Sequence, residues 1–174
     1  MAASLKLPKH DSPEFEDATL YRNIVGGLQY LSLTRPYIFF AVNKICQFIH
    51  SPKTSLWSAV KRVLLYVKGA INFRLLFKPQ RGLHLQTYSD ADWGGCPENM
   101  RSIGGFFIYL GSHLISWSSK KQSTVARSST EAKCKSLASA AAETIWLQTM
   151  LRDLGFSLSQ APTLWCHNLG ATYL

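Results

Sequence analysis

The fold of the second half of the chain is predicted most directly by the stretch Gly104-Gly-Phe-Phe-Ile-Tyr-Leu-Gly-Ser-His-Leu-Ile-Ser-Trp117. Residues 106–110 and 113–117 are short runs rich in aromatic and branched side chains, and Gly111-Ser112 separates them. This spacing is typical of an antiparallel hairpin, because glycine supplies the positive φ that a two-residue turn needs. Residues 83–88 alternate apolar and polar side chains and predict a further strand ahead of the hairpin.

A long helix is predicted after the hairpin, over residues 129–154, and Gly155 ends it. The face of this helix that is expected to pack on the sheet contains Ala138, Ala141, Ile145, Met150 and Leu151. Residues 163–166 then predict one more short, buried strand. The order strand, strand, strand, helix, strand predicts an α/β fold: an antiparallel three-strand meander, a right-handed crossover through the helix, and a parallel strand.

The first half of the chain predicts three amphipathic helices. Apolar residues recur at steps of three and four over residues 21–31, 38–49 and 57–67, and Pro36 and Pro52 separate the three stripes. Three successive stripes argue for helices that pack on one another rather than for a helix lying on a membrane surface. The fold class is therefore α/β, with a small helical bundle ahead of the sheet.

Composition excludes several classes of protein. The chain has 174 residues, of which 47% are hydrophobic and 17% charged, so it can bury a core and is not a disordered polyelectrolyte. No apolar run approaches the roughly 20 residues of a membrane-spanning helix, and no apolar signal sequence opens the chain. The four cysteines form no C-x-x-C pair, which argues against a zinc ribbon. These features together predict an intracellular protein, cytoplasmic or nuclear.

Charge is distributed unevenly along the sequence. The chain carries 19 basic and 10 acidic residues, a net charge of +9, yet residues 18–89 contain no acid and ten bases. We therefore divide the chain into an acidic segment (1–17), a basic helical region (18–82) and an α/β region (83–174). A basic surface of this kind favours a nucleic-acid partner, because phosphate contacts release counterions. The alternatives are a solvated basic face and a surface that docks an acidic protein.

Three polar positions are candidates for chemistry. Asp90 follows the strand predicted at 83–88, where a carboxylate can hold Mg²⁺, although Asp-x-Asp before two glycines is also ordinary turn chemistry. Glu131 could be a metal ligand at the start of the long helix, but with Ser128 it also has the spacing of a helix capping box. His167 follows the last strand, beside Asp90 if the two strands are parallel; an isolated histidine is more often a surface residue.

Basic residues suggest where nucleic acid would bind. The candidates in the two regions are Arg22, Lys61, Arg62, Lys68, Lys120 and Lys121. A solvated loop is the alternative for the last two. The five tryptophans are more typical of a core than of base-stacking platforms, although Trp93, close to Asp90, could be either.

Seven motifs occur in an order that resembles a known family. They are Tyr21-Arg-Asn-Ile-Val-Gly-Gly-Leu-Gln-Tyr-Leu31, Thr34-Arg-Pro36, Ala59-Val-Lys-Arg-Val-Leu-Leu-Tyr66, Tyr88-Ser-Asp-Ala-Asp-Trp-Gly94, Ser116-Trp-Ser-Ser-Lys-Lys-Gln122, Ser128-Ser-Thr-Glu-Ala132 and Trp165-Cys-His-Asn168. The sequence resembles the Pol polyprotein of copia-type LTR retrotransposons from about Tyr21 onward. The resemblance implies that region 18–82 corresponds to the thumb and connection of reverse transcriptase, and region 83–174 to the ribonuclease H domain without its C-terminal part.

The resemblance also implies a chemistry. Ribonucleases H use four carboxylates and two Mg²⁺ or Mn²⁺ ions to cleave the RNA strand of an RNA–DNA hybrid. Asp90 matches the first carboxylate and Glu131 the second. His167 stands where the family has the third, and the fourth would fall beyond Leu174. Lys133 likewise stands where the family has glutamate.

These departures imply a Pol fragment that retains nucleic-acid binding but has lost catalysis. Its expected partners are an RNA–DNA hybrid or other nucleic acid, and other Pol segments. Two alternatives stay open. One is an active metal-dependent ribonuclease in which His167 is an unusual ligand or another chain supplies the missing group; the other is a decayed element without a selected function.

Overall fold

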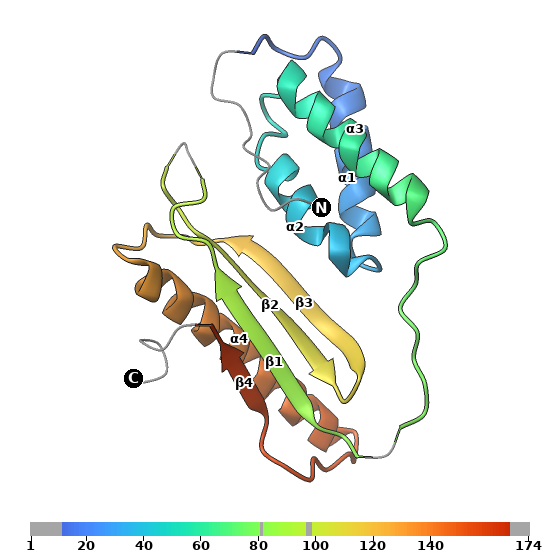
Figure 1. Cartoon of the computed structure of the whole chain (residues 1–174), viewed down its shortest axis with the longest axis vertical. Coiled ribbons are helices and arrows are strands. Elements are labelled where there is room, and N and C mark those ends of the chain that lie inside the picture. The colour runs from blue at the N-terminus through green and yellow to red at the C-terminus, as the bar shows by residue number, and fades with distance from the viewer. Residues whose placement is uncertain (1–11, 81, 97–98, 168–174) are drawn as a thin grey trace. The chain divides into compact units, whose positions relative to one another are not determined.

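A computed structural model describes residues 12–80, 82–96 and 99–167 and divides the chain into two compact units, Met1–Leu75 and Leu76–Leu174 (Figure 1). The first unit is helical, and the second consists of one long helix and a mixed sheet. The α/β class predicted from the sequence is therefore confirmed. Among the residues that the structure describes, no helix is both long and apolar enough to span a lipid bilayer.

The helical unit contains the three helices that the apolar stripes predict, namely α1 (Ala18–Leu31), α2 (Pro36–Cys46) and α3 (Thr54–Gly69). Each helix buries its stripe against the other two, so one shared core results. The side chains at the centre of this core are Tyr21, Val25, Leu28, Ile38, Val42, Ile45, Val60 and Val63. Asp17 caps α1, because its carboxylate accepts a hydrogen bond from the backbone N–H of Leu20 at 2.8 Å.

Arg35 holds the chain that leaves α3. Its guanidinium donates to the backbone carbonyls of Ala70, Ile71 and Phe73 and to the hydroxyl of Tyr37. Carbonyls at the end of a helix lack partners within the helix, and a cation there also complements the helix dipole. The Thr34-Arg35-Pro36 motif thus contains an arginine with a structural role, and this base is already engaged within the unit.

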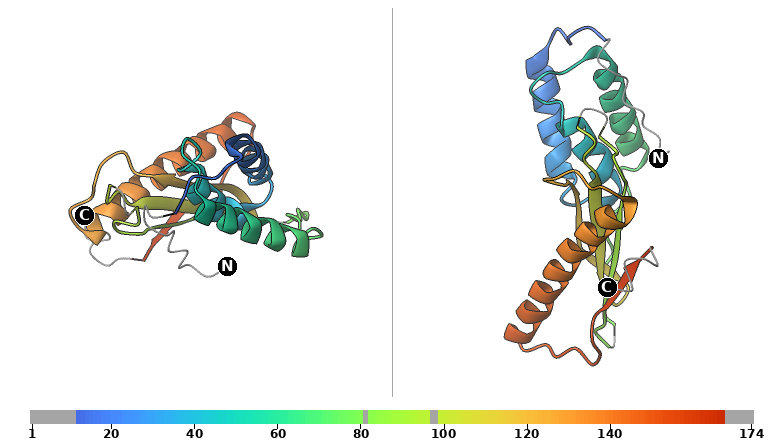
Figure 2. Two further views of the ribbon diagram at one scale, coloured as in Figure 1. Left: turned by 90° about the horizontal axis from the view of Figure 1, so that it is seen from above. Right: turned by 90° about the vertical axis from the view of Figure 1, so that its left-hand side faces the viewer.

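The α/β unit contains β1 (Leu85–Ala91), β2 (Ile103–Leu110), β3 (His113–Lys121), α4 (Ser129–Asp153) and β4 (Thr163–Cys166). The sheet has the order β3-β2-β1-β4, in which β1 is antiparallel to β2 and parallel to β4. Helix α4 covers one face of this sheet (Figures 1 and 2). The predicted hairpin turns at Gly111, which has a φ of 60°, and the predicted meander, crossover and parallel strand are all present.

The face of α4 that packs on the sheet differs from the predicted one except at Leu151, which is buried as expected. Ile145 was expected to face the sheet, but 62% of its surface is exposed. The buried stripe recurs at steps of three and four and contains Ala132, Ser136, Ala140, Thr144, Leu147 and Leu151. Ser136 and Thr144 are polar, and a search for apolar residues overlooks them.

Hydroxyl groups join α4 to the central strands at short range. Ser136 Oγ donates to the backbone carbonyl of Asp90 at 2.8 Å and accepts from Ser89 Oγ at 3.0 Å. Thr144 Oγ1 lies 2.7 Å from Thr87 Oγ1. Gly104 makes this approach possible, since a Cβ at that position would lie 3.1 Å from the Cβ of Ser136. Small side chains on both layers therefore determine how closely the helix lies on the sheet.

We predict that Gly104→Val destabilises the α/β unit by about 1–3 kcal/mol, the usual cost of overfilling a packed interface. Gly104→Ala should cost less than Gly104→Val. Chemical denaturation followed by tryptophan fluorescence measures both. The control is Gly27→Ala in α1, where the added methyl meets no atom within 4 Å, and it should leave the transition of the α/β unit unchanged. Equal stability of Gly104→Val and the unmodified chain would contradict this account of the interface.

Candidate functional site

Asp90 lies within β1 rather than after it. The sequence predicted a strand over 83–88, but β1 continues to Ala91, and Asp90 pairs with Gly105 of β2. Strand side chains alternate, so the buried Ser89 and Ala91 face α4, whereas Asp90 belongs to the exposed set of β1. That side chain is 69% exposed.

His167 follows β4 at the same edge of the sheet. The parallel register pairs Ser89 with Cys166, which brings the ends of β1 and β4 together, as expected from the sequence. His167 is exposed, and its backbone carbonyl accepts a hydrogen bond from Lys133 Nζ at 3.2 Å.

Glu131 lies in the first turn of α4, where it takes part in capping. Ser128 is the N-cap, and its Oγ accepts from the backbone N–H of Glu131 at 3.1 Å. The carboxylate of Glu131 accepts from the backbone N–H of Arg127 at 2.7 Å and pairs with Lys135 Nζ at 2.7 Å. The hydrogen bond from Lys135, followed by the one from Arg127, lowers the pKa of Glu131. Ser128 and Glu131 therefore form hydrogen bonds that cap the start of α4, as the capping interpretation expects.

Lys133 is a site residue that the sequence reasoning did not single out. Its ammonium lies 3.4 Å from Asp90 Oδ1 and 3.2 Å from the carbonyl oxygen of His167, and its side chain is only 20% exposed. One cation thus contacts an oxygen from β1 and another from the residue after β4. The only available signal was the change from the family's glutamate to lysine at this position.

These donors do not fit a resident divalent metal. Both candidate carboxylates, Asp90 and Glu131, are paired with a lysine ammonium. Within the described ranges, no three His, Cys, Asp or Glu side chains lie close enough together to hold a metal ion. An ammonium beside Asp90 would repel Mg²⁺ or Mn²⁺ from that carboxylate.

Basic residues of the helical unit are exposed and available for contacts. Arg22 on α1 and Lys61, Arg62 and Lys68 on α3 are all solvent-exposed. Among the residues that the structure describes, none of these four bases forms an ion pair with an acid. Arg22 Nε donates to the carbonyl of Ile49 at 3.3 Å, and Lys61 Nζ lies 5.8 Å from the ring centre of Trp57.

The two lysines at the end of β3 differ from one another. Lys120 is exposed, whereas Lys121 is half-buried and its ammonium lies 3.2 Å from the Sγ of Cys96. Lys120 is therefore the more accessible of the two for a phosphate.

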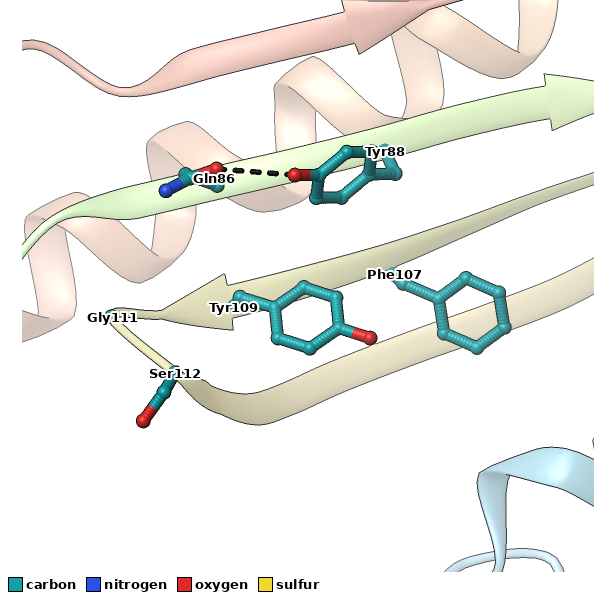
Figure 3. A pocket seen from close by; sticks show the side chains of 6 residues that line it. All are labelled: Gln86, Tyr88, Phe107, Tyr109, Gly111 and Ser112. Atoms are coloured by element: carbon teal, nitrogen blue, oxygen red, sulfur yellow. Dashed lines mark hydrogen bonds between the residues drawn. The ribbon is translucent and has the colours of Figure 1, made fainter.

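The open face of the sheet carries aromatic side chains around a shallow hollow. Figure 3 shows Gln86, Tyr88, Phe107, Tyr109 and Ser112 around it, on β1, β2 and the turn that follows. Trp165 stacks beside Tyr88, with ring centres 6.3 Å apart, and is 52% exposed. The expectation that the tryptophans are core residues is thus wrong for Trp165. It is also wrong for Trp146, which is more than half exposed; Trp93, for which both interpretations were open, is more than half exposed as well.

Comparisons with known proteins give the chain a family. It is 47% identical over its full length to the Retrovirus-related Pol polyprotein from transposon RE2 of Arabidopsis thaliana, and covers 12% of that protein. It is 37% identical over 78% of its length to the Pol polyprotein from transposon TNT 1-94 of Nicotiana tabacum, covering 10% of it. It is also 41% identical over 76% of its length to Secreted RxLR effector protein 161 of Plasmopara viticola, covering 94% of it.

No family model and no solved structure matches the chain. The full-length identity to the Pol polyproteins is nevertheless decisive, and it agrees with the seven ordered motifs. The chain belongs to the copia-type retrotransposon Pol polyproteins, of which it spans a short segment.

Proposed function

We propose that this Pol segment binds nucleic acid through phosphate contacts made by its helical unit, and that it does not hydrolyse RNA–DNA hybrids. The observation that carries the first part is the set of exposed bases on α3, which lies in a stretch of 72 residues (18–89) without any acid. A solvated protein surface normally mixes charges of both signs. A stretch of this length that carries bases and no acid is suited to a polyanion.

The spacing on α3 supports phosphate contacts. Lys61 and Lys68 are seven residues apart, so they lie on the same side of the helix with a separation along its axis of roughly 10 Å. Arg62 lies beside Lys61, and the exposed Leu65 lies between the two lysines. Lysine and arginine at such spacing contact backbone phosphates without reading bases.

We infer a ribonuclease H-like fold for the α/β unit. The support is the sheet order β3-β2-β1-β4 with a helical crossover to the parallel strand, together with the motifs around Asp90, Glu131 and His167. In that family the three positions hold metal-binding carboxylates, and the metal supplies an activated water and neutralises developing charge.

The loss of hydrolysis is supported by what surrounds these positions. Lys133 neutralises Asp90, Glu131 is engaged in capping and in its pair with Lys135, and position 167 is histidine. Loss of one unit charge about 4 Å from a metal, at an effective dielectric of 20, amounts to about 4 kcal/mol. That energy corresponds to roughly a thousandfold in rate.

We predict that the affinity of the chain for duplex nucleic acid falls steeply with salt, with little dependence on sequence. The double variant Lys61→Glu/Lys68→Glu should bind more weakly and should reduce the log–log salt slope by about 0.9 for each phosphate that it no longer neutralises. Fluorescence anisotropy between low and moderate salt measures both quantities. The control is Lys44→Glu on α2, a charge reversal in the same unit. A salt-independent isotherm, or an equal effect of the control, would contradict the proposed binding surface.

We also predict that the unmodified chain does not cleave an RNA–DNA hybrid with either Mg²⁺ or Mn²⁺. His167→Asp alone should not restore cleavage, because the ammonium of Lys133 still neutralises Asp90. A gel assay with end-labelled RNA measures the rate. Cleavage that depends on Mg²⁺ and disappears in Asp90→Asn would establish the active ribonuclease instead.

A further inference from the structure

We propose that the ammonium of Lys133 is a built-in cation of the α/β unit, occupying the position between the ends of β1 and β4 that would otherwise attract a divalent ion. The proposal deepens the proposed loss of hydrolysis and rests on that part of the function alone. The inference does not depend on the proposed binding of nucleic acid by α3.

The ammonium contacts oxygens of the kind that hold hard metal ions. Lys133 Nζ lies 3.4 Å from Asp90 Oδ1 and 3.2 Å from the carbonyl oxygen of His167. Carboxylate and backbone carbonyl oxygens are the ordinary ligands of Mg²⁺ and Ca²⁺. An ammonium group offers three hydrogen-bond donors and one positive charge, so it can satisfy both oxygens at once.

The position of Lys133 is fixed by the helix on which it lies. Ala132, its neighbour, is fully buried against the sheet, and Ser136, three residues later, donates to the backbone carbonyl of Asp90 at 2.8 Å. Helix α4 therefore contacts Asp90 twice, through the backbone by Ser136 and through the carboxylate by Lys133. Side chains three residues apart lie on the same side of a helix, which explains why both reach the same strand residue.

Lys135 shows that a lysine on this helix need not play such a role. Its ammonium pairs with Glu131, four residues earlier, and with Thr124 Oγ1 at 2.9 Å. Both contacts are local to the start of α4, and the Lys135 side chain is more exposed than that of Lys133 (35% against 20%). Lys133 is the lysine that joins the helix to both parallel strands, which makes Lys135 a matched control.

The test measures Mn²⁺ binding to the full chain rather than activity. Free Mn²⁺ is followed by electron paramagnetic resonance in the unmodified chain, in Lys133→Glu and in Lys135→Glu, which carries the same charge change on the same helix. We expect Lys133→Glu to bind one Mn²⁺ with a Kd at least tenfold below that of the unmodified chain. Asp90→Asn should abolish that gain, and Lys135→Glu should not produce it.

A thermal measurement keeps the test valid if Lys133→Glu folds poorly. Lys133→Gln removes the charge and keeps most of the side-chain length, and circular dichroism verifies its fold. Mn²⁺ at a concentration well above Kd should raise the Tm of Lys133→Gln or Lys133→Glu by about 3 °C or more, because an ion that binds only the folded state stabilises it. The Tm of the unmodified chain should not change.

The remaining outcomes separate this inference from the proposed function. If both Lys133 variants fold but gain no Mn²⁺ binding, the inference is overturned and the proposed function is unaffected. If Lys135→Glu gains as much as Lys133→Glu, added charge alone explains the effect and the inference is again overturned. If the unmodified chain binds Mn²⁺ through Asp90, both the inference and the proposed loss of hydrolysis are overturned.

Discussion

The hydrogen bond from Ser136 to the backbone carbonyl of Asp90 is the contact on which the arrangement of the α/β unit depends most. It brings α4 close to β1, where a bulkier pair of residues would hold the two layers apart. Gly104 on the neighbouring strand leaves the room that this approach requires. The hydroxyl contacts of Ser136 and Thr144 add directional hydrogen bonds to the apolar packing of Leu147 and Leu151, and directional bonds specify the register of the helix.

The electrostatics of the candidate site follow from that register. With Ser136 at the carbonyl of Asp90, position 133 lies near the ends of β1 and β4, and whichever side chain stands there faces Asp90. A glutamate would add a negative charge to the cluster, whereas the lysine of this chain neutralises it. The residue at position 133 on α4 therefore determines the charge beside Asp90. The helical unit has its own core and carries the exposed bases of α3, so the nucleic-acid binding proposed for α3 is expected to be independent of position 133.

The strand order, the hairpin turn and the three helices of the first unit could be predicted, because period and turn residues are local signals. The buried face of α4 could not, since Ser136 and Thr144 are polar residues that become buried only by bonding to the sheet. The expected parallel pairing of β1 with β4 was the only basis for predicting that Asp90 and His167 lie at the same end of the sheet. The side-chain contacts of these two residues could not be predicted, because the pairing of Lys133 with Asp90 joins residues 43 positions apart in the sequence. The exposure of Trp165 was missed for a similar reason: apolar character does not tell which face of a sheet is covered.

The family assignment tells which proteins the chain is related to, whereas the side-chain geometry tells which chemistry the candidate site can support. Identity to the Pol polyproteins gives the family, and the contacts of Lys133 support the proposed loss of metal binding at Asp90. The most direct measurement is a crystal structure of the unmodified chain grown with millimolar Mn²⁺, with data collected at the manganese absorption edge. The account predicts the Lys133 ammonium between Asp90 and the carbonyl of His167, with no anomalous peak at that place. A manganese ion bound by Asp90, with Lys133 turned away, would contradict it.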